Sequence, residues 1–205
     1  GSAAALCQAL RDMGKTAYLL YNPEITDTYA PYAAPYWAPE DFAPAHIVST
    51  DIAALNLLPD NAASYASRVE LAIDHHGSHG FFAPNVCLDA EAAACGEIIH
   101  AILLELGVTV TKRIAECLYV AISTDTGCFK FSNTTSNTHR TAAALIEAGA
   151  DVYPINKLFF DTKSFSRLRM EAKLTETMEF YADGTVGVCV MPKRLLAEFS
   201  ATEDD

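Results

Sequence analysis

The chain has 205 residues, of which 51% are hydrophobic and 20% are charged, and it carries a formal net charge of −12. This length fits one large domain, or one domain with part of a second, and this composition can bury a core. The negative charge argues against a protein that holds long duplex nucleic acid through a basic surface. It does not exclude a small phosphorylated substrate held through metal ions.

The cysteines and the length of the apolar runs indicate in which cellular compartment the protein works. The six cysteines are dispersed and form no C-x-x-C pair. This usage predicts free thiols in a reducing, cytoplasmic compartment. The first residues do not form a signal peptide, and no apolar run is long enough to span a bilayer, so we expect no membrane association.

Helical and strand patterns alternate through most of the chain. Helical periodicity over residues 3–13 precedes a strand candidate at 16–21. Five prolines set among aromatic residues then interrupt regular structure over residues 22–45. This stretch could be a lid, a base-stacking platform, or a loop that its aromatic side chains pin onto the core.

The remaining elements follow in the same alternation. Strands are expected at 46–50, 69–73 and 85–88, and helices at 59–67, 91–106, 111–123, 136–148 and 151–160. Strands that alternate with helices predict an α/β fold with a doubly wound, mainly parallel sheet.

Residues 164–205 depart from this alternation of strands and helices. Residues 164–178 predict an exposed connecting helix, and the stretch around Asp183-Gly184 predicts a hairpin. Two strands cannot form a stable independent sheet, so we expect residues 179–205 to begin a second domain, after a first domain at 1–163 and a linker helix at 164–178. Apolar side chains after residue 180 favour association, which leaves a homodimer open.

One stretch of the sequence is the main indication of a functional site. An apolar run from Val69 to Ile73 ends abruptly in Asp74, His75 and His76. In open α/β sheets, ligands bind at the carboxyl ends of the strands. A carboxylate beside two imidazoles offers oxygen and nitrogen donors to a divalent metal. The alternative is a strand followed by a polar turn.

Two other acids follow the same pattern. Asp51 ends the predicted strand at 46–50, and Asp125 ends the apolar helix that begins at residue 111. Burying acids and imidazoles costs free energy unless they are paired or bound to a metal. Carboxylates and imidazoles without thiolates favour Mn²⁺ or Mg²⁺ over structural zinc. Two such ions can activate a water and hold a phosphoryl group.

Four blocks of sequence carry a family resemblance. They are Gly1-Ser2 with its helix, Ser49 to Ala53, Asp74-His75-His76, and Thr124 to Thr135 with its Thr-Asp-Thr-Gly turn. In this order they resemble the DHH phosphoesterase family, in its nanoRNase and pAp phosphatase-like branch. The resemblance covers nearly the whole chain, and residues 164–205 are similar to the family's linker and the start of its C-terminal substrate-binding domain.

The resemblance implies a site that holds two manganese ions, with Mg²⁺ as an alternative. Asp51 resembles the carboxylate that bridges the ions, and His75 and Asp125 resemble ligands of one ion. Asp74 and His76 are then the expected catalytic residues. Asp74 would orient an imidazole as a supporting carboxylate does, and His76 resembles the histidine that contacts the scissile phosphate.

The sequence also departs from the family pattern. The family's first motif, an Asp-x-Asp before a Gly-Ser, does not precede Gly1, and most of the C-terminal domain is missing. The sequence leaves open whether Gly1 and Ser2 belong to the natural protein. We expect the chain as given to bind metal weakly and to hydrolyse poorly.

Several other polar residues are weaker candidates. His79 and Asn133 are predicted substrate contacts, although a solvated loop histidine and a helix-capping asparagine are equal alternatives. Glu97 is a weak candidate for supporting the site from its helix. We interpret the other histidines, His46, His100 and His139, as structural.

The leading function hypothesis is a metal-dependent phosphoesterase. Its substrates would be short oligonucleotides, nucleotides such as pAp, or cyclic dinucleotides, and a processive exonuclease or pyrophosphatase is disfavoured. The first alternative is a non-catalytic domain that binds a nucleotide or another partner. The second is a plain α/β scaffold, in which the acids and histidines would be scattered in space.

Overall fold

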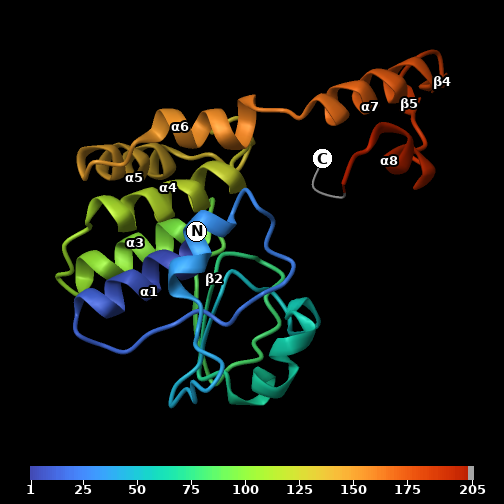
Figure 1. The fold of residues 1–205 in the computed structure, drawn as a ribbon. Helices are drawn as coiled ribbons and strands as arrows, with labels where there is room; N and C mark the ends of the chain where they lie inside the picture. Colours follow the sequence, from blue (N-terminus) through green and yellow to red (C-terminus); the bar gives the residue numbers. More distant parts are fainter. Residues whose placement is uncertain (203–205) are drawn as a thin grey trace. The chain divides into compact units, whose positions relative to one another are not determined.

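The computed structural model describes residues 1–202 and divides the chain into two compact units (Figure 1). The first unit runs from Gly1 to Phe160, and the second begins at Asp161. The predicted α/β fold is confirmed in the first unit, where helices surround a parallel sheet.

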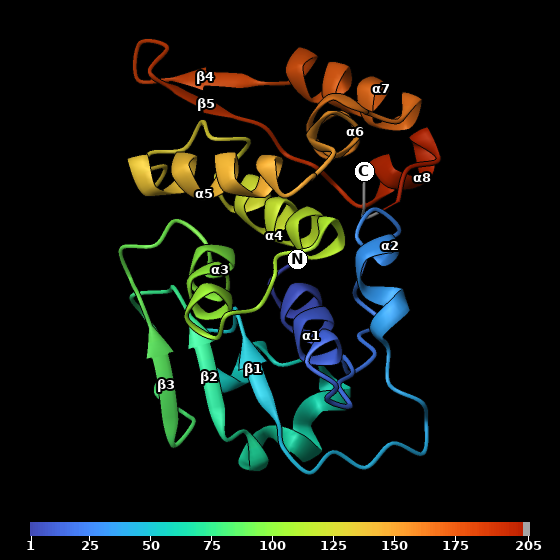
Figure 2. The ribbon, with the colours of Figure 1, turned by 90° about the vertical axis from the view of Figure 1, so that its left-hand side faces the viewer.

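The sheet has three parallel strands in the order β1-β2-β3. They are β1 (Val48–Thr50), β2 (Leu71–Asp74) and β3 (Asn85–Leu88). Thr50 lies opposite Ile73, and Asp74 lies opposite Leu88. The arrowheads in Figure 2 point to one edge of the sheet, so the residues that follow β1 and β2 meet there.

Apolar residues pack against both faces of the central strand β2. Leu71 and Ile73 of β2 pack into the main core with α1 (Ser2–Asp12) and α3 (Cys95–Glu105), while Ala72 joins a smaller cluster with Val86 on the opposite face. Alternate residues of a strand point to opposite faces, which accounts for this division. In Figure 1, α1 and α3 lie on one side of the strands and the 3-10 segment η3 (Asp60–Arg68) lies on the other.

Helix α4 (Lys112–Asp125) forms the centre of the helical layer. Its residues Ile114, Leu118 and Ile122 are fully buried, and it contacts α1, α3, α5 (Ser136–Glu147) and α6 (Val152–Asn156). A π-helical turn, η4 (Lys157–Asp161), follows α6.

Glycine allows α3 to approach α4 closely. A Cβ atom on Gly96 would lie 3.0 Å from Ala121 Cβ and 3.3 Å from the Leu118 carbonyl oxygen, both on α4. These distances are shorter than ordinary van der Waals contacts. Gly96 therefore sets the spacing of the two helices. The close packing that it allows outweighs the helix propensity that a glycine loses.

The predicted strand at 16–21 is wrong. Leu19 forms a single isolated parallel bridge with Trp37. The Leu19 N–H donates to the Tyr36 carbonyl oxygen at 2.7 Å, and the Ala38 N–H donates to the Leu19 carbonyl oxygen at 2.8 Å. The partner segment is rich in proline, which lacks the N–H that a longer ladder needs. The helix expected at 59–67 is the 3-10 segment η3.

Two arginines fasten the proline-rich segment to the core. This segment contains the short helices α2 (Ala30–Ala33) and η1 (Ala34–Tyr36). Arg113 donates to the Pro31 carbonyl oxygen at 2.9 Å and to the Tyr36 hydroxyl at 3.2 Å, and Arg11 donates to the Pro35 carbonyl oxygen at 3.1 Å. These bonds favour the interpretation of residues 31–36 as a pinned loop.

The second unit is small. It contains α7 (Phe165–Glu176), the antiparallel pair β4 (Glu179–Tyr181) and β5 (Val186–Val188), and α8 (Arg194–Phe199). Met170, Leu195 and Phe199 form its core, whereas both strands are exposed throughout.

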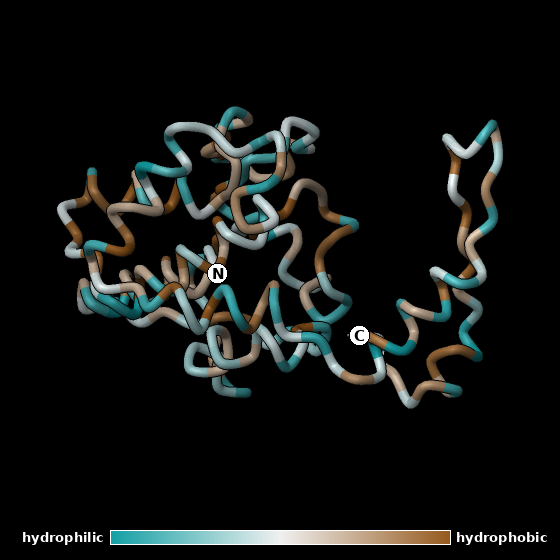
Figure 3. Tube along the Cα trace, turned by 90° about the horizontal axis from the view of Figure 1, so that it is seen from above, coloured by the Kyte–Doolittle hydropathy of each residue, from teal (hydrophilic) through white to brown (hydrophobic). Residues whose placement is uncertain are grey.

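No helix within residues 1–202 combines the length and the hydrophobicity needed to cross a bilayer. In Figure 3 the hydrophobic stretches are short and are interrupted by hydrophilic residues.

We predict that Gly96→Val destabilises the first unit by about 1–3 kcal/mol, because the added side chain must push α3 away from α4. Urea denaturation followed by circular dichroism measures this change. The control is Ala101→Val at an exposed position of the same helix. Ala101→Val loses helix propensity whereas Gly96→Val gains some, so propensity cannot explain a larger loss of stability at Gly96. Equal stability of the two variants would contradict the close-packing argument.

Candidate metal centre

Four polar side chains meet at the carboxyl edge of the sheet. Asp51 follows β1, Asp74 ends β2, and His75 and His76 come next. Each contributes one ligand atom to a group in which all of these atoms lie within 4.8 Å of one another. The parallel register of β1 and β2 brings the two strand ends together, as the sequence pattern predicts.

Asp51 has a left-handed backbone, with φ of 65°. This conformation is uncommon for a non-glycine residue, although aspartate tolerates it better than most. The Asp51 N–H donates to the Ile73 carbonyl oxygen at 2.9 Å, which extends the pairing of β1 and β2 by one residue. The backbone strain at Asp51 is of the kind that occurs at functional sites.

His75 lies between two carboxylates. Its Nε2 atom is 3.3 Å from Asp51 Oδ1 and 3.6 Å from Asp125 Oδ2. Its Nδ1 atom is 3.2 Å from the Ala92 carbonyl oxygen, which can only accept, so Nδ1 carries a proton. The hydrogen bond to Asp51 raises the pKa of His75 to about 9, against the lowering effect of burial. A cation in this position would replace the Nε2 proton.

Asp125 is the last residue of α4 and supplies the third carboxylate. Burial, followed by the negative charge of Asp51, raises its pKa to about 6. Its Oδ2 atom is buried and has no hydrogen-bond partner within residues 1–202. A buried carboxylate oxygen that lacks a hydrogen bond costs free energy, which a bound cation would recover.

Asp74 is fully buried and holds His76. Its Oδ1 atom accepts from His76 Nδ1 at 2.7 Å and from the His75 backbone N–H at 2.8 Å. Its Oδ2 atom is also buried, without a hydrogen-bond partner in the described part of the chain. The His76 side chain is 44% exposed. Since Nδ1 is engaged, Nε2 is the ring nitrogen of His76 that a ligand could reach.

The two predicted substrate contacts have different surroundings. His79 is buried against Phe81 and Phe82, and its Nδ1 atom accepts from the Phe81 N–H at 3.0 Å. The alternative of a solvated loop histidine is therefore wrong. Asn133 donates from Nδ2 to two backbone carbonyl oxygens, at Ala93 and at Asp125.

Glu97 is buried but bonds to α5. Its Oε1 atom accepts from the Thr138 hydroxyl at 2.8 Å, and its Oε2 atom accepts from Asn137 Nδ2 at 2.7 Å. It therefore anchors the first turn of α5, where Thr135 forms a capping box with Thr138. In this structure the side chain of Glu97 therefore links α3 to α5.

Sequence reasoning missed Tyr29. Its hydroxyl lies near the side chain of Thr124, which precedes Asp125, and its ring lies 4.9 Å from the Phe159 ring. Burial raises the pKa of Tyr29. The aromatic segment predicts a lid in general terms, but no local sequence pattern indicates this particular contact.

The donors fit a divalent cation. They are carboxylate oxygens and imidazole nitrogens, and two of the buried oxygens, Asp74 Oδ2 and Asp125 Oδ2, lack hydrogen bonds within the described range. Such a set suits Mn²⁺ or Mg²⁺, whereas structural zinc sites use thiolates more often.

Known proteins resemble this chain over nearly all of its length. A bifunctional oligoribonuclease and PAP phosphatase from Thermus thermophilus is 30% identical over 202 residues, which are 97% of this chain and 60% of that protein. The protein of the same description from Bacillus subtilis is 25% identical over 211 residues, covering 100% of this chain and 66% of that protein. No protein-family model matches the chain.

A solved structure shares the fold. The exopolyphosphatase-related protein from Bacteroides fragilis matches with a TM-score of 0.87 at 21% identity, over 98% of this chain and 64% of that one. The chain thus spans 60% to 66% of the length of these three relatives.

We predict that Mn²⁺ binds to the cluster and that Asp51→Asn weakens binding by at least about tenfold, because the substitution removes a charged donor from the centre of the group. Calorimetry on the purified chain measures the affinity. Asp60→Asn, which removes an exposed acid at the start of η3, is the matched control. The assignment fails if the two variants bind Mn²⁺ equally well.

Proposed function

Since the chain belongs to the DHH phosphoesterase family, we propose that it hydrolyses phosphate or phosphodiester bonds in short oligonucleotides or in nucleotides such as pAp, at the cluster between β1, β2 and α4. The relatives from Thermus thermophilus and Bacillus subtilis are described as oligoribonucleases and PAP phosphatases, which supports this choice of substrate class. Cyclic dinucleotides are a further class of the same chemistry.

One observation carries the proposal. Asp51 and Asp125 come from opposite parts of the chain, yet both place carboxylate oxygens within 3.6 Å of the same nitrogen of His75. One imidazole cannot balance two carboxylates, because the acids repel each other and burial raises the pKa of Asp125 even beside His75. The same arrangement is a good cation site.

We assign the cation ligands as Asp51, His75 and Asp125. A bound Mn²⁺ or Mg²⁺ would supply Lewis acidity and an activated water to phosphate hydrolysis. Ala92 fixes the tautomer of His75 through its carbonyl oxygen, so Nε2 faces the two acids. Outer hydrogen bonds of this kind keep a ligating imidazole oriented.

His76 and Asp74 would act on the substrate together. The buried carboxylate of Asp74 accepts a hydrogen bond from His76 Nδ1 and holds the ring in place. The partly exposed Nε2 atom is then free to bind a phosphate oxygen, or to give a proton to the leaving oxygen. The Asp74 carboxylate stabilises the protonated ring, as a buried acid does for a catalytic histidine.

His79 remains a proposed substrate contact. Because Nδ1 accepts from the Phe81 N–H, the ring proton lies on Nε2. This N–H is buried and has no partner among residues 1–202. A buried donor without a partner gains free energy when a phosphate oxygen reaches it.

We predict that His76→Gln lowers kcat about 10²- to 10⁴-fold for hydrolysis of pAp and of a 5′-phosphorylated dinucleotide, because glutamine cannot donate a proton as an acid. Phosphate release and chromatography of the products, in the presence of Mn²⁺, measure the rates.

The control is His46→Gln, which changes an exposed histidine paired with Glu70. Equal loss of activity in both variants would contradict the role of His76. Nucleotide binding without any hydrolysis by the unmodified chain would favour a non-catalytic binding domain.

A further inference from the structure

The side chain of Asn133 joins two segments that shape the cluster. Its Nδ2 atom donates to the Ala93 carbonyl oxygen at 3.1 Å and to the Asp125 carbonyl oxygen at 3.2 Å. A side-chain amide nitrogen has two hydrogens, so each carbonyl uses one of them. The two carbonyl partners also fix which end of the amide is nitrogen.

The two carbonyls belong to the segments that hold His75 and Asp125. Ala93 adjoins Ala92, whose carbonyl oxygen accepts from His75 Nδ1. Asp125 itself supplies the carboxylate that lies 3.6 Å from His75 Nε2. One side chain therefore connects the residue that orients the imidazole with the acid that faces it.

A strained turn brings Asn133 to this place. Gly127, Cys128 and Phe129 all have positive φ, at 55°, 57° and 64°. The Cys128 N–H donates to the Ser123 carbonyl oxygen at 2.7 Å, and the Phe129 N–H donates to the Thr126 hydroxyl at 3.1 Å. Left-handed residues other than glycine persist only where surrounding contacts hold them, and they gather at functional sites.

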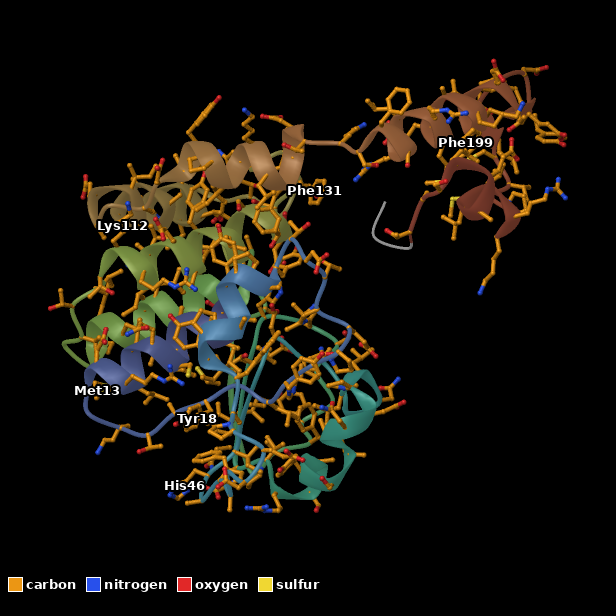
Figure 4. The ribbon with its side chains drawn as sticks, viewed as in Figure 1. Met13, Tyr18, His46, Lys112, Phe131 and Phe199 are labelled. Atoms are coloured by element: carbon orange, nitrogen blue, oxygen red, sulfur yellow. The ribbon has the colours of Figure 1, made fainter. Side chains whose placement is uncertain are left out.

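Phe131 closes the same turn. Its ring packs over Gly127 and leaves no space for a Cβ atom there. In Figure 4 the Phe131 side chain lies beyond the end of α4. The chain therefore folds back immediately after Asp125, and Asn133 reaches the last turn of the helix.

We propose that Asn133 is a positioning residue that fixes the separation of His75 and Asp125 and thereby prepares the cation site. This inference rests on the proposed function in one respect, the assignment of the cluster as a cation site. Both amide hydrogens are bound to the backbone, so the remaining atom, Oδ1, is an acceptor and has nothing to donate to a phosphate oxygen. This assignment replaces the sequence-based expectation of a substrate contact.

The test compares Mn²⁺ affinity in Asn133→Asp and Asn133→Ser, each measured by calorimetry. Aspartate keeps the shape but presents oxygens to both carbonyls, and serine keeps one short donor in case the aspartate variant does not fold. We expect affinity to fall about 10- to 100-fold, as for other groups that orient metal ligands. We also expect excess Mn²⁺ to restore kcat while KM for the nucleotide stays unchanged.

The matched control is Asn61→Ala. Asn61 also donates its side-chain amide to a backbone carbonyl, at Tyr21, but its partner residue is not in the cluster. This variant should bind Mn²⁺ normally. A comparable loss in the control would mean that the effect is general destabilisation, and it would overturn the proposal.

The outcomes separate this inference from the proposed function. Normal Mn²⁺ affinity with a raised KM in both Asn133 variants would make Asn133 a substrate contact and overturn the inference, while hydrolysis itself would stand. Weakened Mn²⁺ binding in a chain that hydrolyses no nucleotide would support the positioning role and reject the proposed function.

Discussion

The parallel pairing of β1 with β2 is the constraint on which the site depends. It places Thr50 opposite Ile73, so Asp51 and the Asp74-His75-His76 run leave the sheet at the same edge. The Asp51 N–H continues this pairing by one bond to the Ile73 carbonyl oxygen. A shift of β2 by one residue would turn Ile73 out of the core and move Asp74, His75 and His76 to the wrong face. The burial of Ile73 therefore protects the geometry of the acids and imidazoles.

Helix α4 links the core to this edge. Its buried residues pack against α1, α3, α5 and α6, and its last residue, Asp125, faces His75. The close approach at Gly96 fixes where the helix lies, and the hydrogen bond from Asn133 to the Asp125 carbonyl oxygen holds its last turn. Packing and hydrogen bonding thus act on the same acid from two sides. A cation site needs this rigidity, because metal–ligand distances tolerate little error.

Much of the sheet and of the candidate site can be predicted from the sequence. Apolar runs that end in Asp51 and Asp74 predict acids at a sheet edge, because strand periodicity and burial are local signals. Residues 16–21 do not form the predicted strand, because β propensity alone does not show whether a partner segment with free N–H groups is available. The burial of His79 and the two carbonyl partners of Asn133 depend on contacts with distant or folded-back segments, which no local pattern encodes.

The separation of the proposed ligands along the chain has a consequence for folding. Asp51 and Asp125 are 74 positions apart (125 − 51), and they meet only after the sheet has paired and α4 has docked. Contacts between such distant residues form late, since loop closure must precede them. A cation bound there would therefore stabilise the finished unit and would not nucleate its folding. Occupancy of the site would report on the completion of folding, and the metal would act on the unfolding rate more than on the folding rate.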